Sequence, residues 1–183
     1  VCQIPCGCGK TLISIKLCMD YKQCVVVAPL KAYCEQNMER YRSQMPEYGM
    51  LVIDSDNNGR DLDNISSFIK KNKKVCLFVT FKSVDIVNAL VANGILKADK
   101  YFVVIDEFHN LSQNNILDEK DNFYSLLNNL KLKILFMSAT PIPRTIVLAR
   151  YGDLDVSVIG EKPPGRKDIN TLVMSSAKEQ ELI

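Results

Sequence analysis

Five short apolar runs recur along the chain, and each is typical of a β-strand buried on both faces. Between them lie segments whose apolar residues recur every three or four positions, as in amphipathic helices. Strands and helices that alternate in this way predict an α/β fold with a parallel sheet and helices on both faces. The predicted strands are residues 24–28, 50–53, 75–80, 101–106 and 133–138, and the predicted helices are residues 10–20, 31–43, 61–71, 83–93 and 119–130.

The C-terminal segment has a different pattern, because four of the seven prolines lie after residue 140. Here the sequence predicts a short helix over 144–151, a short strand over 156–159 and an extended connector over 162–167. A further strand and the start of a helix follow. This segment therefore looks like a linker and the opening of a second domain.

Composition places the chain among ordinary globular proteins. It has 183 residues, 47% apolar and 24% charged, with a formal net charge of +2. A balance so close to neutral does not by itself indicate a nucleic-acid-binding protein. We expect no membrane association, since no apolar run approaches the roughly 18 residues of a membrane span, and the first residues do not resemble a signal peptide.

The cysteines indicate the redox environment. Their number, seven, is odd, and several lie inside the predicted strands and helices. Thiols in such positions behave as small apolar side chains, so we expect an intracellular, reducing compartment such as the cytoplasm, the nucleus or a viral factory.

The segment Pro-Cys-Gly-Cys-Gly-Lys-Thr at residues 5–11 leads into the first predicted helix. It matches most of the phosphate-loop pattern, in which glycines let backbone N–H groups approach phosphate oxygens at a helix N-terminus. Its lysine would reach the β- and γ-phosphates, and its threonine would offer a hydroxyl to Mg²⁺. A glycine turn before a helix is the simpler alternative. The predicted nucleotide-binding residues are Cys6, Gly7, Cys8, Gly9, Lys10 and Thr11.

Two carboxylates, Asp106 and Glu107, end the fourth apolar strand. Side chains at the carboxyl ends of parallel strands reach the ligand crevice of such sheets. Asp106 would hold Mg²⁺ and Glu107 would orient and deprotonate the attacking water, which together with a lysine is what phosphoryl transfer requires. The alternative is a strand that ends in two solvent-facing acids.

His109 is the only histidine and lies two residues beyond Glu107. The next predicted strand ends in Ser138-Ala139-Thr140. Hydroxyl residues there are compatible with simple turn chemistry. Beside the carboxylates, they would instead link the γ-phosphate site to the rest of the molecule.

Together, segments 5–11, 106–109 and 138–140 resemble motifs I, II and III of superfamily 2 helicases in order and spacing. The resemblance covers roughly residues 1–145 and implies a RecA-like, P-loop ATPase domain that binds ATP and Mg²⁺. It implies catalytic roles for Lys10, Thr11, Asp106 and Glu107, with Thr11 and Asp106 at the metal, and a coupling role for His109, Ser138 and Thr140.

The same family resemblance implies where nucleic acid lies. Ala28-Pro29-Leu30 looks like the start of motif Ia, and Thr80-Phe81-Lys82-Ser83 occupies the place of a further strand-end contact. The implied nucleic-acid contacts are Pro29, Leu30, Lys31, Thr80 and Ser83.

Two parts of the chain resemble different branches of superfamily 2. Residues 1–136 look like members from large DNA viruses and XPB-like helicases, through the Pro-Cys-Gly-Cys-Gly-Lys-Thr run. Residues 137–170 resemble the RecG helicases, through Ser-Ala-Thr-Pro-Ile-Pro-Arg-Thr and Pro-Pro-Gly-Arg-Lys. RecG proteins have glutamine where this chain has Phe108. The RecG-like segment favours DNA over RNA, in repair or replication.

Motors of this superfamily have two RecA-like domains. By resemblance, we expect residues 1–143 to form the first, without its usual beginning, and residues 144–183 to link it to a second domain that this chain lacks. That second domain would supply an arginine finger, worth roughly 10³–10⁵ in rate. We therefore expect the isolated chain to hydrolyse ATP slowly or not at all.

Two other functions fit the same residues. A nucleotide-binding module without turnover is one, and an RNA helicase domain is the other, because RNA helicases carry related acidic motifs. The basic run at residues 70–74 most simply ends a helix, where cations suit the helix dipole, although a role in nucleic-acid binding is the alternative.

Overall fold

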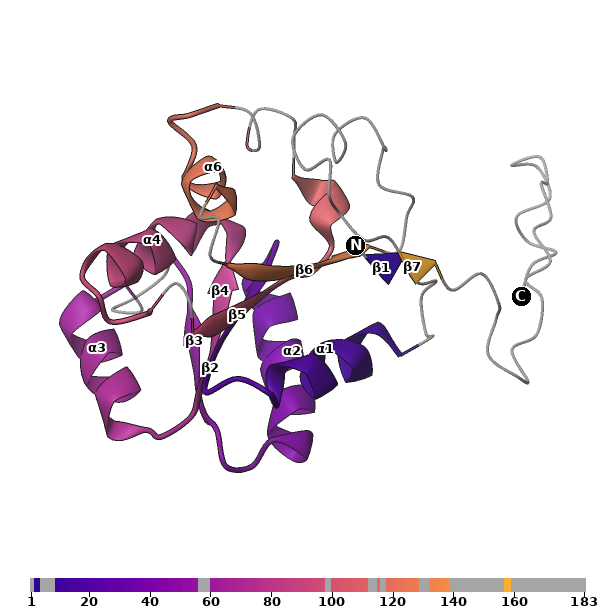
Figure 1. Cartoon of the computed structure of the whole chain (residues 1–183), viewed down its shortest axis with the longest axis horizontal. Coiled ribbons are helices and arrows are strands. Elements are labelled where there is room, and N and C mark those ends of the chain that lie inside the picture. Colours follow the sequence, from indigo (N-terminus) through magenta and orange to yellow (C-terminus); the bar gives the residue numbers. More distant parts are fainter. Residues whose placement is uncertain are drawn as a thin grey trace, which may run out of the picture.

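A parallel β-sheet organises the chain (Figure 1). The structure is a computed structural model that describes residues 2–3, 9–55, 60–97, 100–111, 115, 118–128, 132–138 and 157–158. The strand order in the described part is β3-β4-β2-β5-β6-β1-β7, and every pairing is parallel. The strands are β1 (Cys2–Gln3), β2 (Gln23–Ala28), β3 (Gly49–Ile53), β4 (Val75–Thr80), β5 (Tyr101–Ile105), β6 (Lys133–Ser138) and β7 (Ser157–Val158).

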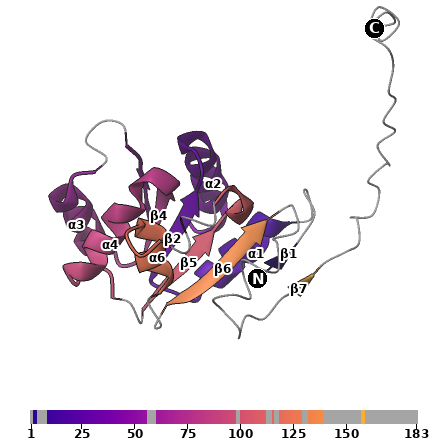
Figure 2. The same cartoon turned by 90° about the horizontal axis from the view of Figure 1, so that it is seen from above.

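Helices cover both faces of this sheet, as the sequence predicts. α1 and α2 pack on one face, and α3, α4 and α6 lie on the other (Figures 1 and 2). The helices are α1 (Lys10–Cys18), α2 (Lys31–Gln44), α3 (Leu62–Lys71), α4 (Val84–Ala92) and α6 (Asn122–Leu127), with short 3₁₀ turns η1 (Phe81–Ser83) and η2 (Phe108–Asn110).

Alternate residues of the central strands enter two separate cores. On β2, Val25 and Val27 face the core under α3, α4 and α6, whereas Cys24, Val26 and Ala28 face the core under α1 and α2. All five are at most 1% exposed. The continuous apolar runs in the sequence therefore arise from burial on both faces, and this confirms the predicted doubly covered sheet.

The structure also corrects details of the prediction. The helix predicted from residue 119 begins only at Asn122, because residues 119–120 form a turn and the Asp121 side chain caps the helix by accepting a hydrogen bond from the Phe123 N–H at 2.8 Å. The strand predicted over 156–159 appears as β7. The sequence pattern did not reveal η1, η2 or β1. The predicted helix at 144–151 and the elements after residue 158 lie outside the described residues.

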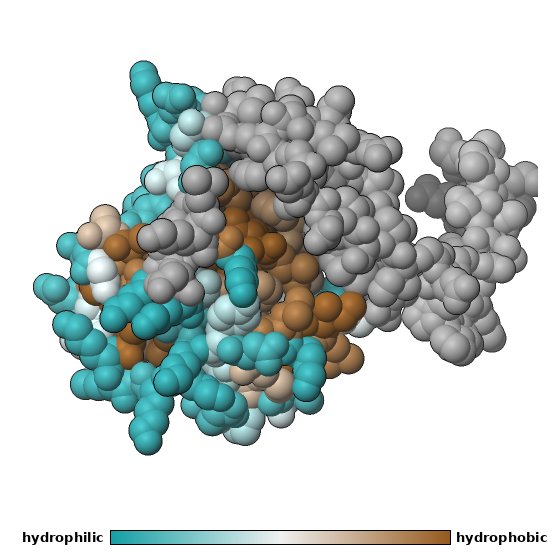
Figure 3. Space-filling model, in the orientation of Figure 1, coloured by the Kyte–Doolittle hydropathy of each residue, from teal (hydrophilic) through white to brown (hydrophobic). Residues whose placement is uncertain are grey.

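Hydrophilic and apolar side chains are unevenly distributed over the face of the molecule that Figure 3 shows. Hydrophilic side chains cover the surface over α3, and apolar surface is exposed around α1. Within the described residues, no helix has the length and apolar character needed to cross a bilayer.

The start of α3 gives a stability test. Asp61 accepts hydrogen bonds from the backbone N–H groups of Asp63 and Asn64 at 2.9 and 3.2 Å, so it caps the helix. Asp61→Ala should lower the free energy of unfolding by about 1 kcal/mol, because it leaves two N–H groups without a protein acceptor. Asp63 lies in the same turn but does not cap the helix, so Asp63→Ala should lower the free energy of unfolding by only a few tenths of a kcal/mol. Urea unfolding of both variants measures the difference, and equal losses would contradict the capping role.

Candidate functional site

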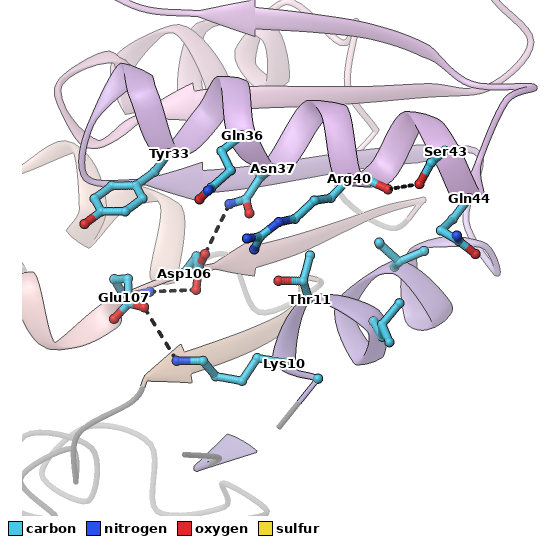
Figure 4. Close-up of a pocket in the computed structure, with 13 residues that line it drawn as sticks. Lys10, Thr11, Tyr33, Gln36, Asn37, Arg40, Ser43, Gln44, Asp106 and Glu107 are labelled. Carbon is cyan, nitrogen blue, oxygen red and sulfur yellow. Dashed lines mark hydrogen bonds and ion pairs between the residues drawn. The ribbon is translucent and has the colours of Figure 1, made fainter. Parts of the chain in front are cut away.

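The carboxyl edge of the sheet gathers most of the predicted functional residues. The ends of β3, β4, β2, β5 and β6 lie side by side there in that order. A cavity of about 490 Å³ opens beside the end of β5, between α1 and α2 (Figure 4). Gly9, Lys10 and Thr11 line it together with Asp106 and Glu107. Two motifs 96 residues apart in the sequence, taken from Lys10 to Asp106, therefore share one cavity.

Gly9 sets the direction in which α1 enters the site. Its φ of +86° lies in the left-handed region, which glycine adopts without strain. Among the described residues, chain neighbours aside, no atom lies within 4 Å of where a Cβ would be, and Gly9 lines the cavity together with Lys10 and Thr11. A helix N-terminus at a cavity is suited to an anion such as a phosphate.

Lys10 extends from the first turn of α1 toward Glu107. Its Nζ lies 3.5 Å from Glu107 Oε1, while the lysine side chain is only 11% exposed. This is an ion pair without a hydrogen bond, because Lys10 Nζ is buried and has no hydrogen-bond partner among the described residues. A buried ammonium with unused donors is costly, and phosphate oxygens would satisfy it.

Asp106 is held from two sides. Its Oδ2 accepts a hydrogen bond from Asn37 Nδ2 at 3.1 Å, and its Oδ1 accepts one from the Glu107 N–H at 3.0 Å (Figure 4). Burial raises the pKa of Asp106 above its ordinary value; the Asn37 hydrogen bond opposes this rise, and the neighbouring Glu107 charge adds to it. A divalent cation would favour the charged carboxylate and relieve this penalty.

Glu107 has an unusual backbone. Its φ of 50° and ψ of 44° place it in the left-handed region, and it is the only such non-glycine residue in the described part of the chain. This conformation costs roughly 1–2 kcal/mol for a residue with a side chain. Glu107 lies two residues beyond the end of β5 and directly before η2, which brings His109 back to the Glu107 carboxylate. Strain of this kind is characteristic of functional positions.

His109 connects Glu107 with the next strand. Its Nδ1 lies 3.3 Å from Glu107 Oε2 and 3.0 Å from Ser138 Oγ. Ser138 is the last residue of β6 and is fully buried. A continuous polar path therefore runs from Lys10 through Glu107 and His109 to Ser138.

Helix α2 contributes residues that sequence reasoning missed. Tyr33, Gln36, Asn37, Arg40 and Gln44 all line the cavity, and Arg40 points from α2 toward Asp106 and Thr11 (Figure 4). They recur three or four positions apart, so they share one helix face. That polar periodicity was the available signal, but only the fold shows that this face meets the end of β5.

The residues predicted to contact nucleic acid come together at neighbouring strand ends. Ala28, the last residue of β2, pairs with Thr80, the last residue of β4, so the segment that follows β2 begins beside the end of β4. Leu30 is 60% exposed, Pro29 is partly exposed, and Lys31 Nζ pairs with Asp54 Oδ2 at 2.8 Å. The Thr80 and Ser83 side chains are buried, with Thr80 Oγ1 donating to Ser83 Oγ at 3.1 Å. These residues shape the surface, and their contact with nucleic acid stays a prediction.

Several predicted residues lie outside the described part of the chain. They are Cys6, Gly7, Cys8 and Thr140. Among the described residues, no group of three or more His, Cys, Asp or Glu side chains could hold a metal ion. Thr11 and Asp106, which both line the cavity, offer oxygen atoms of the kind that Mg²⁺ takes together with the phosphates of a substrate.

Comparison with known proteins agrees with this arrangement. The family DEAD/DEAH box helicase matches residues 1–148. The ATP-dependent DNA helicase RecG of Aquifex aeolicus (strain VF5) is 32% identical over 187 residues, which cover 95% of this chain and 22% of the relative. RecG of Haemophilus influenzae is 30% identical over 192 residues, which cover 97% of this chain and 25% of the relative. The likeness to RecG thus extends well beyond residues 137–170.

Solved structures share the fold. A RecG structure bound to a three-way DNA junction superposes with a TM-score of 0.60 at 24% identity, covering 98% of this chain and 23% of that one. The helicase domain of Pyrococcus furiosus Hef superposes with a TM-score of 0.60 at 17% identity, covering 86% of this chain and 34% of that one. The chain spans about a quarter of the RecG relatives, and it belongs to the DEAD/DEAH box helicase family with a RecA-like fold.

Proposed function

We propose that this chain is a motor domain of an ATP-dependent DNA helicase or translocase, which binds Mg-ATP and couples its hydrolysis to movement along nucleic acid. The observation that carries the proposal is the polar path from Lys10 through Glu107 and His109 to Ser138. It joins the place where a γ-phosphate would lie to the end of the next strand.

Each side chain has a defined part in hydrolysis. Lys10 would contact the β- and γ-phosphate oxygens, and Asp106 and Thr11 would hold Mg²⁺, which would supply positive charge to the phosphates. Glu107 orients a water molecule and takes its proton as the water oxygen attacks the γ-phosphorus. The bond from that phosphorus to the β,γ-bridging oxygen then breaks, and the electron pair leaves with ADP. Lys10 Nζ lies 3.5 Å from Glu107 Oε1 and His109 Nδ1 lies 3.3 Å from Oε2, so the two side chains flank the carboxylate and fix its position.

The relatives support DNA as the partner. The similar proteins are named as DNA helicases, and one RecG structure holds a three-way DNA junction, which supports DNA over RNA. We propose that a second RecA-like domain completes the active site, with residues 1–143 as the first domain and 144–183 leading to the second. A reducing intracellular compartment suits the buried free thiols of Cys18, Cys24, Cys34 and Cys76.

Nucleotide binding tests the phosphate site. Lys10→Ala should weaken Mg-ATP binding by about 10- to 100-fold, because a charge-assisted contact to phosphate is worth roughly 1.5–3 kcal/mol. Lys16→Ala removes an exposed lysine from the same helix and should leave the affinity unchanged. Calorimetric titration with ATP in the presence and absence of Mg²⁺ measures both. If the Lys10 variant binds as tightly as the unaltered chain, the site is misassigned.

Asp106 should limit stability where it is ionised. Its folded-state pKa lies above the unfolded value of about 3.9, so the charged form is penalised in the folded state above that folded pKa. Asp106→Asn should therefore raise the free energy of unfolding at pH 7.5, and the gain should shrink as pH falls toward 3.9. Urea unfolding at pH 7.5 and pH 4 tests this beside the exposed Asp63→Asn. A gain of equal size at both pH values would refute the explanation.

The His109–Ser138 contact should transmit binding between sites. In the unaltered chain, saturating duplex DNA should change the Kd for Mg-ATP by at least about fivefold, the lower end of typical coupling. In Ser138→Ala, the ratio of the Kd for Mg-ATP without DNA to the Kd with saturating DNA should be close to one. The Kd without DNA should be nearly the same as in the unaltered chain. Ser125→Ala, an exposed serine on α6, is the control. An undiminished ratio in the Ser138 variant would exclude the contact as the coupler.

A further inference from the structure

A second cavity lies at the opposite edge of the sheet from the nucleotide site. Its volume is about 480 Å³, and its walls come from the segments that precede β2, β4 and β5. Four lysines line it: Lys22, Lys73, Lys97 and Lys100. Strands of five or six residues separate the two edges by roughly 16–20 Å, at about 3.3 Å per residue. The cavity is therefore remote from the catalytic carboxylates.

Backbone hydrogen bonds bring these lysines together. The Val75 N–H donates to the Lys22 carbonyl at 2.9 Å, which joins the segment before β2 to the segment before β4. The Lys100 N–H donates to the Lys97 carbonyl at 2.8 Å and closes a turn before β5. Asn72, also in the wall, donates from Nδ2 to the Phe68 carbonyl at 2.8 Å and is held at the end of α3. The sheet thus assembles a basic surface from three separate segments.

The charge balance differs sharply from that of the nucleotide cavity. There, Lys10 and Arg40 are matched by Asp106 and Glu107. Here the four lysines face a single carboxylate in the wall, Asp20, so the described lining carries a formal excess of three positive charges. Asp99, between two of the lysines in sequence, lies outside the described residues. A cavity with this excess attracts an anion that brings no cation with it.

The ammonium groups of these four lysines are accessible to a ligand. Within the described residues, none of the four makes an ion pair or a side-chain hydrogen bond, and all are exposed. The dipole of α3 explains cations in its last turn, such as Lys70 and Lys71, but not lysines that arrive from the other two segments. Within the described lining, positive charge from three segments exceeds the negative charge, and such an excess attracts an anionic ligand.

The chemistry favours a nucleic-acid backbone over a small nucleotide. The Tyr21 ring in the wall is already stacked on Phe102 with centroids 4.9 Å apart, so that face is closed to a base. Exposed ammonium groups on flexible stems bind phosphates as point charges, without the planar geometry that selects one ligand. Such contacts position a backbone and do not read its sequence.

We infer that this basic cavity binds the phosphodiester backbone of DNA, as a second contact on the edge of the sheet away from the nucleotide site. The inference rests on the proposed DNA motor function and extends it. A duplex arm held here would remain bound at a fixed point while another strand moves across the carboxyl edge.

Salt-dependent DNA binding by the 183-residue chain tests this. A labelled 30-base-pair duplex is titrated by fluorescence anisotropy between 25 and 200 mM NaCl. The test variant is Lys73→Gln/Lys97→Gln/Lys100→Gln, and the control, with the same loss of charge at exposed sites elsewhere, is Lys16→Gln/Arg42→Gln/Lys120→Gln. Each lost phosphate contact lowers the slope of log K against log salt by about 0.9. We expect the slope to fall by about 2–3 in the test variant and by less than one in the control.

Three other results would overturn the inference. Equal slopes in the test variant and the unaltered chain would exclude a DNA contact at the basic cavity and leave the motor proposal intact. Tripolyphosphate binding that only the test variant loses, with its DNA slope unchanged, would make the cavity a small-anion site. No DNA binding by the unaltered chain at 25 mM NaCl would overturn both proposals, while Mg-ATP binding that depends on Lys10 would still identify a nucleotide-binding module.

Discussion

The ion pair between Lys10 and Glu107 is the interaction on which the site depends. It joins the first turn of α1 to the end of β5, two places that only the parallel sheet brings together. Both side chains are largely withdrawn from water, and the lysine keeps unused donors beside the cavity at the helix N-terminus. Asp106, held by Asn37, and Glu107, held in a left-handed backbone, complete a site arranged in advance for a ligand that carries both phosphates and a cation.

The sequence could predict the parts of this arrangement that are written in runs and motifs. Strands buried on both faces are continuous apolar runs, so β2, β4 and β5 were found nearly to the residue. Lys10, the two carboxylates and His109 could be singled out in the sequence because their residue types suit phosphoryl transfer; the structure brings them together, and their catalytic roles stay predictions. Phe108 stands where RecG proteins have glutamine, and its role is structural. Its side chain is buried and packs edge-on against Phe136, with the two ring centroids 4.6 Å apart.

Other features depend on tertiary geometry and left little trace in the sequence. Asn37 lies 69 positions from Asp106, and only the packing of α2 beside β5 makes it a hydrogen-bond donor to that carboxylate. The left-handed backbone of Glu107 carries no compositional signal, since glutamate rarely adopts it. The lysines that line the basic cavity come from three separate segments of the chain. Of these segments, only the basic run at residues 70–74 stands out in the sequence. The two edges of the sheet thus differ in charge: two cations face two carboxylates in the cavity beside α1, whereas the described lining of the basic cavity has an excess of three positive charges.

The most direct test of the central claim uses Mn²⁺ in place of Mg²⁺ and follows it by pulsed electron paramagnetic resonance. With ATP present, the chain should bind Mn²⁺ with resolved ³¹P couplings, and Asp106→Ala, verified as folded by circular dichroism, should lose most of that bound signal. Without ATP, neither protein should retain the ion, because the account assigns part of the coordination sphere to the phosphate oxygens. An unchanged Mn²⁺ signal in the Asp106 variant would contradict the account, because the metal would then be held without the carboxylate around which the site is built.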